Sequence, residues 1–241
     1  MKTTKLLIIL AVLPLLFVSC ISDWHAISGN GAIFSESMSV PNFESIELQS
    51  AADLVIVKGG TFSVNVSDYE NLLQYLTVKV VDNRLVIKKE PETVNLWNSK
   101  AKVIVTMPDS LYAVTLAGSG EIRIDPAFSK LQSLMLYGSG SILIEDYCSL
   151  DKLEAQITGS GNIRAKGSVN NLTTQISGSG DMLFSDLEAY DAKCTLTGSG
   201  NIYISVENEL DAYLSGSGDV IYYGNPTVNS YASGSGKVYK R

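Results

Sequence analysis

The 241-residue sequence has very little of the residues on which most enzyme and metal sites depend: one histidine, three cysteines and two tryptophans. Because the only histidine, His25, lies close to the N-terminus, a Ser-His-Asp triad or a histidine-ligated metal is excluded from the rest of the chain. Cys20, Cys148 and Cys194 have no Cys-x-x-Cys spacing, so a thiolate metal site is not expected. We therefore predict no metal and no cofactor.

Other functional signals are missing as well. The chain has 18 basic and 25 acidic residues, for a net charge of −7, so a nucleic-acid partner is not expected. No Gly-Lys-Ser/Thr follows the glycines and no Gly-x-Ser-x-Gly surrounds a serine, which excludes a phosphate loop and a nucleophile elbow. Beyond the N-terminus, no apolar run is long enough to span a bilayer.

What the sequence does have is a repeat. The triplet Gly-Ser-Gly occurs seven times at intervals of 18 to 21 residues, and apolar residues alternate with polar ones on both sides of each triplet. The glycines of the seven triplets, which we expect at turns, are Gly118 and Gly120, Gly138 and Gly140, Gly159 and Gly161, Gly178 and Gly180, Gly198 and Gly200, Gly216 and Gly218, and Gly234 and Gly236.

The alternation indicates which way each repeat faces. In Leu196-Thr-Gly-Ser-Gly-Asn-Ile202, the apolar residues and both glycines share one parity and should face a core, whereas Ser199 and Asn201 should face water. Glycine there implies backbone that passes where no side chain fits, or that bends with unusual dihedral angles. Since a coil of about 20 residues cannot bury its apolar row alone, coils must stack, and we predict an all-β parallel solenoid. A β-propeller is the main competitor, but its repeats run to about 40 residues.

The segment before the triplets has a related pattern. Residues 45–57 keep the apolar frame with Ser-Ala-Ala where Gly-Ser-Gly would stand, so the solenoid is predicted to begin near residue 43 and to continue to residue 241. We expect a short helix over residues 70–76, a hairpin over 77–87 and a mobile loop over 88–101.

The N-terminus has the pattern of an export signal. Two lysines precede an apolar run over residues 6–18, which ends in Val18-Ser19-Cys20. A small residue before a cysteine resembles a bacterial lipoprotein cleavage box, which implies a signal peptide over 1–19, lipid on Cys20, and a linker over 20–42. Ile21 in place of aspartate favours the outer membrane of a Gram-negative cell. An ordinary signal peptide with an incidental cysteine is the alternative.

The serial triplets, with Phe43-Glu-Ser-Ile-Glu-Leu, Leu54-Val-Ile-Val-Lys-Gly59 and Val103-Ile-Val-Thr-Met-Pro108, resemble the auto-transporter adhesin head GIN domain family over about residues 43–225. That family, formerly a domain of unknown function, is common in Bacteroidetes lipoproteins. The resemblance implies a right-handed β-helix similar to pectin lyases, triplets at tight turns between its sheets, and a role in cell adhesion. Because the family's role was itself inferred from its fold, it carries little information about mechanism.

A carbohydrate-active enzyme is the main challenger, because pectin-lyase-like solenoids often carry such activity on carboxylates from adjacent coils. The residue directly after each triplet is expected to face outward, and in two coils it is a carboxylate, Asp181 and Asp219. These two residues would lie two coils apart, at nearly 10 Å. We interpret the row instead as stacked Asn and Asp side chains that hold turn geometry. Its members are Glu121, Ser141, Asn162, Asp181, Asn201, Asp219 and Lys237.

Outward tyrosines near the C-terminus are the candidate binding surface: Tyr203, Tyr213, Tyr223 and Tyr231. Aromatic cover for an exposed sheet or the terminal coil is the alternative explanation. The sequence as a whole predicts a non-catalytic, lipid-anchored protein of the cell surface or outer membrane that acts as a binding or adhesion module, with a glycan or a host or cell-surface protein as candidate partners. A carbohydrate-active enzyme, a glycan-binding scaffold and a purely structural envelope protein remain open.

Overall fold

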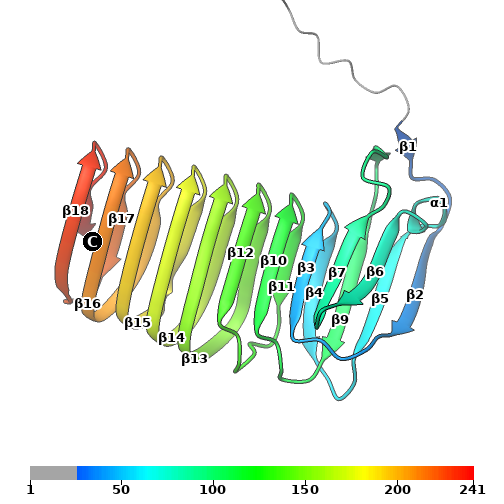
Figure 1. Cartoon of the computed structure of the whole chain (residues 1–241), viewed down its shortest axis with the longest axis horizontal. Coiled ribbons are helices and arrows are strands. Elements are labelled where there is room, and N and C mark those ends of the chain that lie inside the picture. The colour runs from blue at the N-terminus through cyan, green and yellow to red at the C-terminus, as the bar shows by residue number, and fades with distance from the viewer. Residues whose placement is uncertain (1–25) are drawn as a thin grey trace, which may run out of the picture.

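The computed structural model describes residues 26–241 and shows coils stacked along one long axis, with the N-terminal elements at one end and the C-terminus at the other (Figure 1). The strands are β1 (Ile27–Ser28), β2 (Ile33–Ser39), β3 (Ser45–Gln49), β4 (Asp53–Lys58), β5 (Ser63–Tyr69), β6 (Leu76–Val81), β7 (Arg84–Lys89), β8 (Leu96–Trp97), β9 (Lys102–Met107), β10 (Ala113–Gly118), β11 (Glu121–Ile124), β12 (Ser133–Gly138), β13 (Ser141–Gly159), β14 (Asn162–Gly178), β15 (Asp181–Gly198), β16 (Ile202–Gly216), β17 (Val220–Tyr223), β18 (Thr227–Gly234) and β19 (Val238–Lys240). The one helix of these residues is α1 (Glu70–Leu73).

The coils form two walls of parallel strands. In one wall, β3 pairs with β10, β10 with β12, and the later halves of β13 to β16 continue the stack to β18. In the other wall, β4 pairs with β11, and the earlier halves of β13 to β16 continue to β17 and β19. The triplets keep register, because Gly178 lies opposite both Gly159 and Gly198. The predicted fold class, an all-β parallel solenoid, is confirmed.

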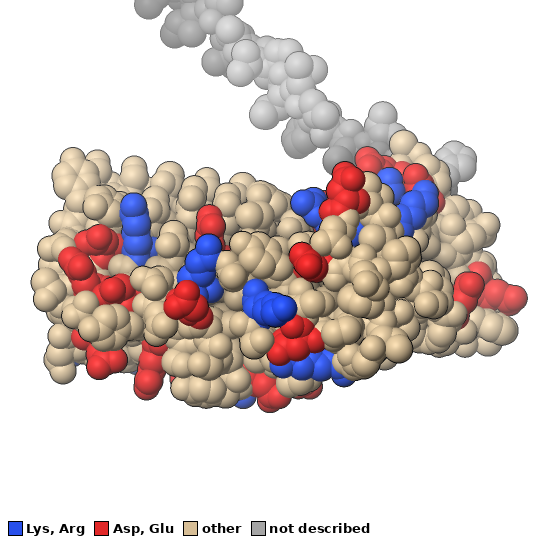
Figure 2. All heavy atoms as spheres, turned by 60° about the horizontal axis from the view of Figure 1, so that its bottom comes forward, with Lys and Arg blue, Asp and Glu red and all other residues tan. Residues whose placement is uncertain are grey.

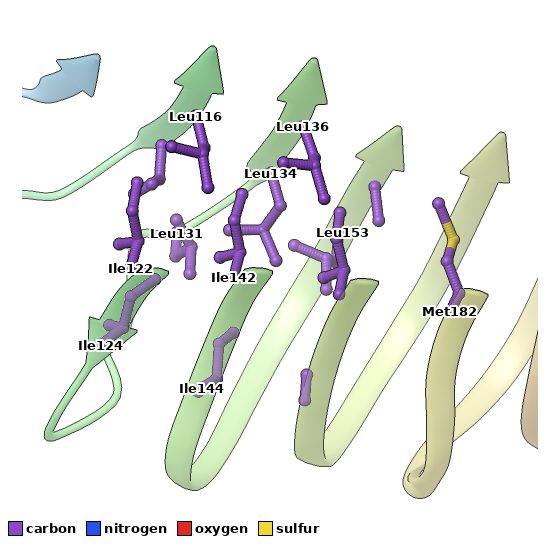
Figure 3. Close-up of a cluster of buried hydrophobic side chains, with 14 of the residues drawn as sticks. Leu116, Ile122, Ile124, Leu131, Leu134, Leu136, Ile142, Ile144, Leu153 and Met182 are labelled. Atoms are coloured by element: carbon purple, nitrogen blue, oxygen red, sulfur yellow. The ribbon is translucent and has the colours of Figure 1, made fainter. Parts of the chain in front are cut away.

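The core lies between the two walls and is filled by the apolar rows of each coil. Ile122 and Ile142 of one wall and Leu134 of the other are fully buried, and Figure 3 shows them in the space between the walls. Leu131, Leu153 and their counterparts in later coils belong to the same buried cluster. Burying each such side chain contributes about 1.5–3 kcal/mol, so stacking supplies what a single coil lacks.

Each triplet makes a corner whose glycines are required by the neighbouring coil. From the second triplet onward, the first glycine has a positive φ, for example +127° at Gly198, and a Cβ built there would lie 2.1 Å from the carbonyl oxygen of Gly178. At Gly200 a Cβ would meet the carbonyl oxygen of Gly180 at 1.9 Å. Glycine is therefore needed because the backbone of the neighbouring coil lies too close for a side chain. Parity alone predicts a different reason, namely that the glycines face the core.

Antiparallel strands cap the N-terminal end. β5 lies between β2 and β9 and is antiparallel to both, while β6 and β7 form the predicted hairpin. The hairpin turns at Asp82 and Asn83, whose φ values of 49° and 62° suit a two-residue turn. Because β2 belongs to the large sheet, strand structure begins before residue 43, inside the segment 20–42 that we expected to be the lipidated N-terminus and linker.

Two local predictions need adjustment. The helix α1 ends at Leu73, earlier than the predicted residue 76, because β6 begins at Leu76. The segment 88–101 contains β8, which pairs with β1. The predicted signal peptide and Cys20 lie outside the described residues, among which no helix is long and apolar enough to cross a membrane.

Candidate functional site

The residues that follow the triplets form a hydrogen-bonded ladder. The side-chain oxygen of Asn162 accepts from the backbone N–H of Asp181 at 3.2 Å, and the carboxylate of Asp181 accepts from the backbone N–H of Asn201 at 2.7 Å. Asn201 in turn accepts from Asp219, and Asp219 from Lys237. The carboxylates of Asp181 and Asp219 therefore hold turns, as the structural interpretation of this row predicts, which confirms that interpretation.

Two thiols lie in the core, where they are expected to be unreactive. Cys148 and Cys194 are free and buried, and they occupy different rows, opposite Gly167 and Thr174 respectively. Burial raises the pKa of Cys148 to about 11 and that of Cys194 to about 12. Both therefore remain protonated and packed at neutral pH. Within residues 26–241, no group of three His, Cys, Asp or Glu side chains gathers in a way that could hold a metal ion.

The four predicted binding tyrosines do not form one patch. Tyr213 and Tyr231 lie side by side on β16 and β18, and their exposed fractions are 46% and 69%. Tyr203 and Tyr223 belong to the other wall, where Tyr203 lies opposite Ile221 and Tyr223 opposite Ser205. Both are only half-buried. The structure thus brings together one pair, Tyr213 and Tyr231, and separates the other two from it.

The paired tyrosines have polar neighbours on the same face. Lys193 lies 5.8 Å from the ring centroid of Tyr213, which places its ammonium over the ring. In the adjacent outward row, the side-chain amide of Asn229 donates to Asp211 at 3.0 Å and to Glu209 at 2.9 Å. An exposed aromatic pair beside carboxylates and an amide can stack on a flat apolar surface and hydrogen-bond its hydroxyl groups.

Charge on the surface is otherwise dispersed. Figure 2 shows acidic side chains gathered over the C-terminal coils, and acidic and basic ones interspersed over the rest of that face. Ion pairs of the described residues, such as Arg84 with Glu47 at 2.8 Å and Lys58 with Asp109 at 3.4 Å, lie at the surface. By itself, an ion pair of this kind contributes about 0–1 kcal/mol to stability.

A hollow lies at the N-terminal cap, in a region that the sequence analysis left without a function. It is a groove of about 790 Å³ between the Ser50–Ala52 corner, α1 and the segment 95–102. This corner is the place where later coils carry Gly-Ser-Gly, and Gly118 stacks directly on Ser50 from one side. The groove opens on the other side of the corner.

A buried carboxylate fixes one wall of this groove. Asp68 is 3% exposed, and its two oxygens accept from the backbone N–H of Lys100 at 2.8 Å, from that of Tyr69 at 2.8 Å, and from the hydroxyl of Ser99 at 2.6 Å. Three donors satisfy the carboxylate and tie residues 99–100 to β5. No short motif could have predicted this groove, because its walls come from segments up to about 50 residues apart.

Comparison with known proteins finds one matching family and several solved structures with a similar fold. The family model described as "Putative auto-transporter adhesin, head GIN domain" matches residues 42–226. Two similar solved structures are a "putative adhesin" from Bacteroides fragilis (20% identity, TM-score 0.82, covering 90% of this chain and 100% of that one) and a "putative lipid binding protein" from Parabacteroides distasonis (24%, 0.78, 90% and 99%). A "putative adhesin" from Parabacteroides merdae is 20% identical, with a TM-score of 0.72 and coverage of 90% and 99%. At these identities the likeness shows the fold alone. No curated protein matches the chain.

Proposed function

The chain belongs to the family described as "Putative auto-transporter adhesin, head GIN domain", and from this premise we propose that it is a non-catalytic, lipid-anchored adhesion module on the outer membrane of a Gram-negative bacterium. The family description supports a surface role in adhesion. The lipid anchor is supported by the sequence Val18-Ser19-Cys20 at the end of an apolar run. A non-catalytic role is supported by the Asp181 and Asp219 carboxylates, which are engaged in turns.

The arrangement of the ends supports this function. The first described strand, β1, begins only seven residues after Cys20, at the capped end of the stack. The C-terminal coils lie at the opposite end (Figure 1). From Gly118 to Gly234 the stack has six steps of about 4.8 Å, or about 29 Å. Lipid on Cys20 would hold the capped end near the membrane and place the C-terminal coils farther from it.

The observation that carries the proposal is the exposed pair of Tyr213 and Tyr231 near that far end. Exposed aromatic side chains in register offer a rigid surface at low entropic cost, which favours binding. The neighbouring hydrogen bond from Asn229 to Asp211 favours a glycan as one ligand class, because sugar hydroxyls pair with carboxylates and amides. The lipid in the name of the Parabacteroides distasonis protein supplies no argument here, because that likeness shows the fold alone.

Adhesion by cells that display the chain tests this function. Tyr213→Ser/Tyr231→Ser should reduce attachment to host cells or to glycan-coated beads by about tenfold, which corresponds to about 1.4 kcal/mol. The matched control is Tyr147→Ser/Tyr190→Ser, which removes two other tyrosines that are 67% and 49% exposed. Equal attachment by both variants and the unchanged chain would refute the tyrosine surface.

The anchor needs a separate measurement. Cys20→Ala should abolish labelling by radioactive fatty acid and release the chain from the membrane fraction, because no thiol remains at the cleavage box. Unchanged labelling would refute the anchor without affecting the adhesion experiment.

A further inference from the structure

The groove at the N-terminal cap has a lining that the proposed adhesion function does not use. Its floor is aliphatic and comes from three separate places: Ala51 and Ala52 of the first corner, Leu72 of α1 with Leu76 at the start of β6, and Leu96 and Ala101 of the facing segment. Tyr75 is the only aromatic residue in the lining. Sugar sites depend on aromatic faces, whereas methyl and methylene groups of this kind match an aliphatic chain.

Three lysines lie among the lining residues: Lys89, Lys100 and Lys102. In the part of the chain that the structure describes, none of them forms an ion pair, whereas Lys58, Lys79 and Lys88 do. The ammonium of Lys89 donates only to the backbone carbonyl of Val94. These lysines therefore give the groove positive charge without a carboxylate partner, in a chain with an overall net charge of −7.

Two carboxylates also line the groove, and together they leave part of the lysine charge unbalanced. Asp68 is 3% exposed, and both of its oxygens accept hydrogen bonds that hold Ser99 and Lys100 in the wall of the groove. Asp53 is exposed at the start of β4 and lies opposite Lys102 of β9, but these two described residues form no ion pair. Three lysines against two carboxylates leave a net positive lining.

We propose that this groove binds a single aliphatic chain with one anionic head group, such as a fatty-acid carboxylate, taken as a monomer from solution. The chain lies on the floor formed by Leu76 and Leu96, which are half-buried, and the head group pairs with the lysines. The volume of about 790 Å³ lies within the range of small-molecule sites. Asp68 holds the wall in place before the ligand arrives, which reduces the ordering cost of binding.

Calorimetric titration with octanoate, decanoate and dodecanoate, each below its micelle concentration, tests the proposal. The protein is the chain from residue 20 with Cys20→Ser, which keeps every described residue. Affinity should rise by up to about fourfold for each added methylene while the chain still lies on the floor. Decanol, which has the same chain without the charge, should bind at least about fivefold more weakly than decanoate.

Charge-matched variants separate the groove from the rest of the surface. Lys89→Gln/Lys100→Gln/Lys102→Gln should weaken decanoate binding by at least about fivefold. A matched triple variant, Lys130→Gln/Lys152→Gln/Lys166→Gln, removes the same charge elsewhere and should bind as the parent does. Leu96→Gln should weaken the chain-length dependence, and its circular dichroism spectrum and unfolding midpoint show whether it has folded.

Three outcomes would overturn the proposal. The first is no heat of binding for any of the acids, and the second is equal loss of binding in the two triple-lysine variants. The third is binding of an oligomeric uronic acid or of anionic vesicles in place of monomeric decanoate, which would make the occupant a sugar acid or a membrane surface. Because the adhesion variants lie at the other end of the stack, failure of this proposal leaves the adhesion experiment unaffected.

Discussion

Replacing one glycine of a triplet with alanine should destabilise the solenoid strongly, because two independent costs coincide at that position. At Gly198, φ is +127° and an added Cβ would lie 2.1 Å from the carbonyl oxygen of Gly178. A dihedral of this kind costs a residue with a side chain about 1–3 kcal/mol. Moving a packed neighbour to make room costs about 1–3 kcal/mol more. Gly198→Ala should therefore lower the free energy of unfolding by about 2–6 kcal/mol.

Three other glycines separate these two costs. Gly31 has a φ of +83° with nothing within 4 Å of an added Cβ, so Gly31→Ala should show the dihedral cost alone, about 1–3 kcal/mol. At Gly200, φ lies outside the left-handed region but the Cβ would meet Gly180 at 1.9 Å, so Gly200→Ala should show the steric cost alone. Gly60 has neither feature, and Gly60→Ala should change stability by no more than about 0.5 kcal/mol.

Urea unfolding followed by circular dichroism provides the measurement, with the midpoint and slope of each variant compared with those of the parent. The predicted order of destabilisation is Gly198 first, Gly31 and Gly200 between, and Gly60 last. If Gly198→Ala proved as stable as Gly60→Ala, the corners would not be packed coil against coil and the reasoning would be refuted.

Two further predictions concern titratable groups. Burial raises the pKa values of Cys148 and Cys194 to about 11 and 12, so in a Cys20→Ser chain neither thiol should react with a disulfide reagent at about pH 8 until urea unfolds the protein. Rapid reaction of the folded Cys20→Ser protein would contradict their placement. Burial acts to raise the pKa of Asp109, but hydrogen bonds from Ser129 and the charge of Lys58 outweigh it and lower the pKa. The stabilisation from Asp109 is therefore present above its unfolded pKa and is lost as the pH falls through the folded value, so Asp109→Asn should lower the thermal midpoint at about pH 7 and leave it unchanged at about pH 2. An equal effect at both pH values would contradict this.

The stacked architecture was predictable because one local rule recurs at every coil. The parity of Leu196 and Ile202 around a triplet defines a buried row, and its recurrence defines the stack. The same parity cannot show that Gly198 is required by Gly178, since it distinguishes only the inside of a sheet from the outside and contains no information along the stacking direction.

The separation of the tyrosines could have been predicted from their spacing along the sequence. The inward or outward parity of each tyrosine does not show which wall it belongs to. Tyr203, Tyr213 and Tyr223 lie ten residues apart, which is half of a coil, so successive members fall on opposite walls. Tyr213 and Tyr231 are 18 residues apart, one full coil, and therefore lie side by side.

The groove could not have been predicted from any local pattern. Its walls meet because Asp68 on β5 holds Ser99 and Lys100 in place across 31 and 32 residues of sequence, and because the Ser50–Ala52 corner lacks a covering coil on one side. A contact of this kind depends on the cap as a whole, which only the three-dimensional structure shows.

Disulfide trapping between neighbouring corners tests the stacked arrangement most directly. The hydroxyl oxygens of Ser217 and Ser235 lie 3.2 Å apart on adjacent coils, so Ser217→Cys/Ser235→Cys should form an intramolecular disulfide readily under mild oxidation. Ser199 lies one coil further away, at about 10 Å from Ser235, so Ser199→Cys/Ser235→Cys should not. Efficient cross-linking of the first pair alone is the predicted result, in a Cys20→Ser background. Equal cross-linking of both pairs, or of neither, would contradict coils stacked in register.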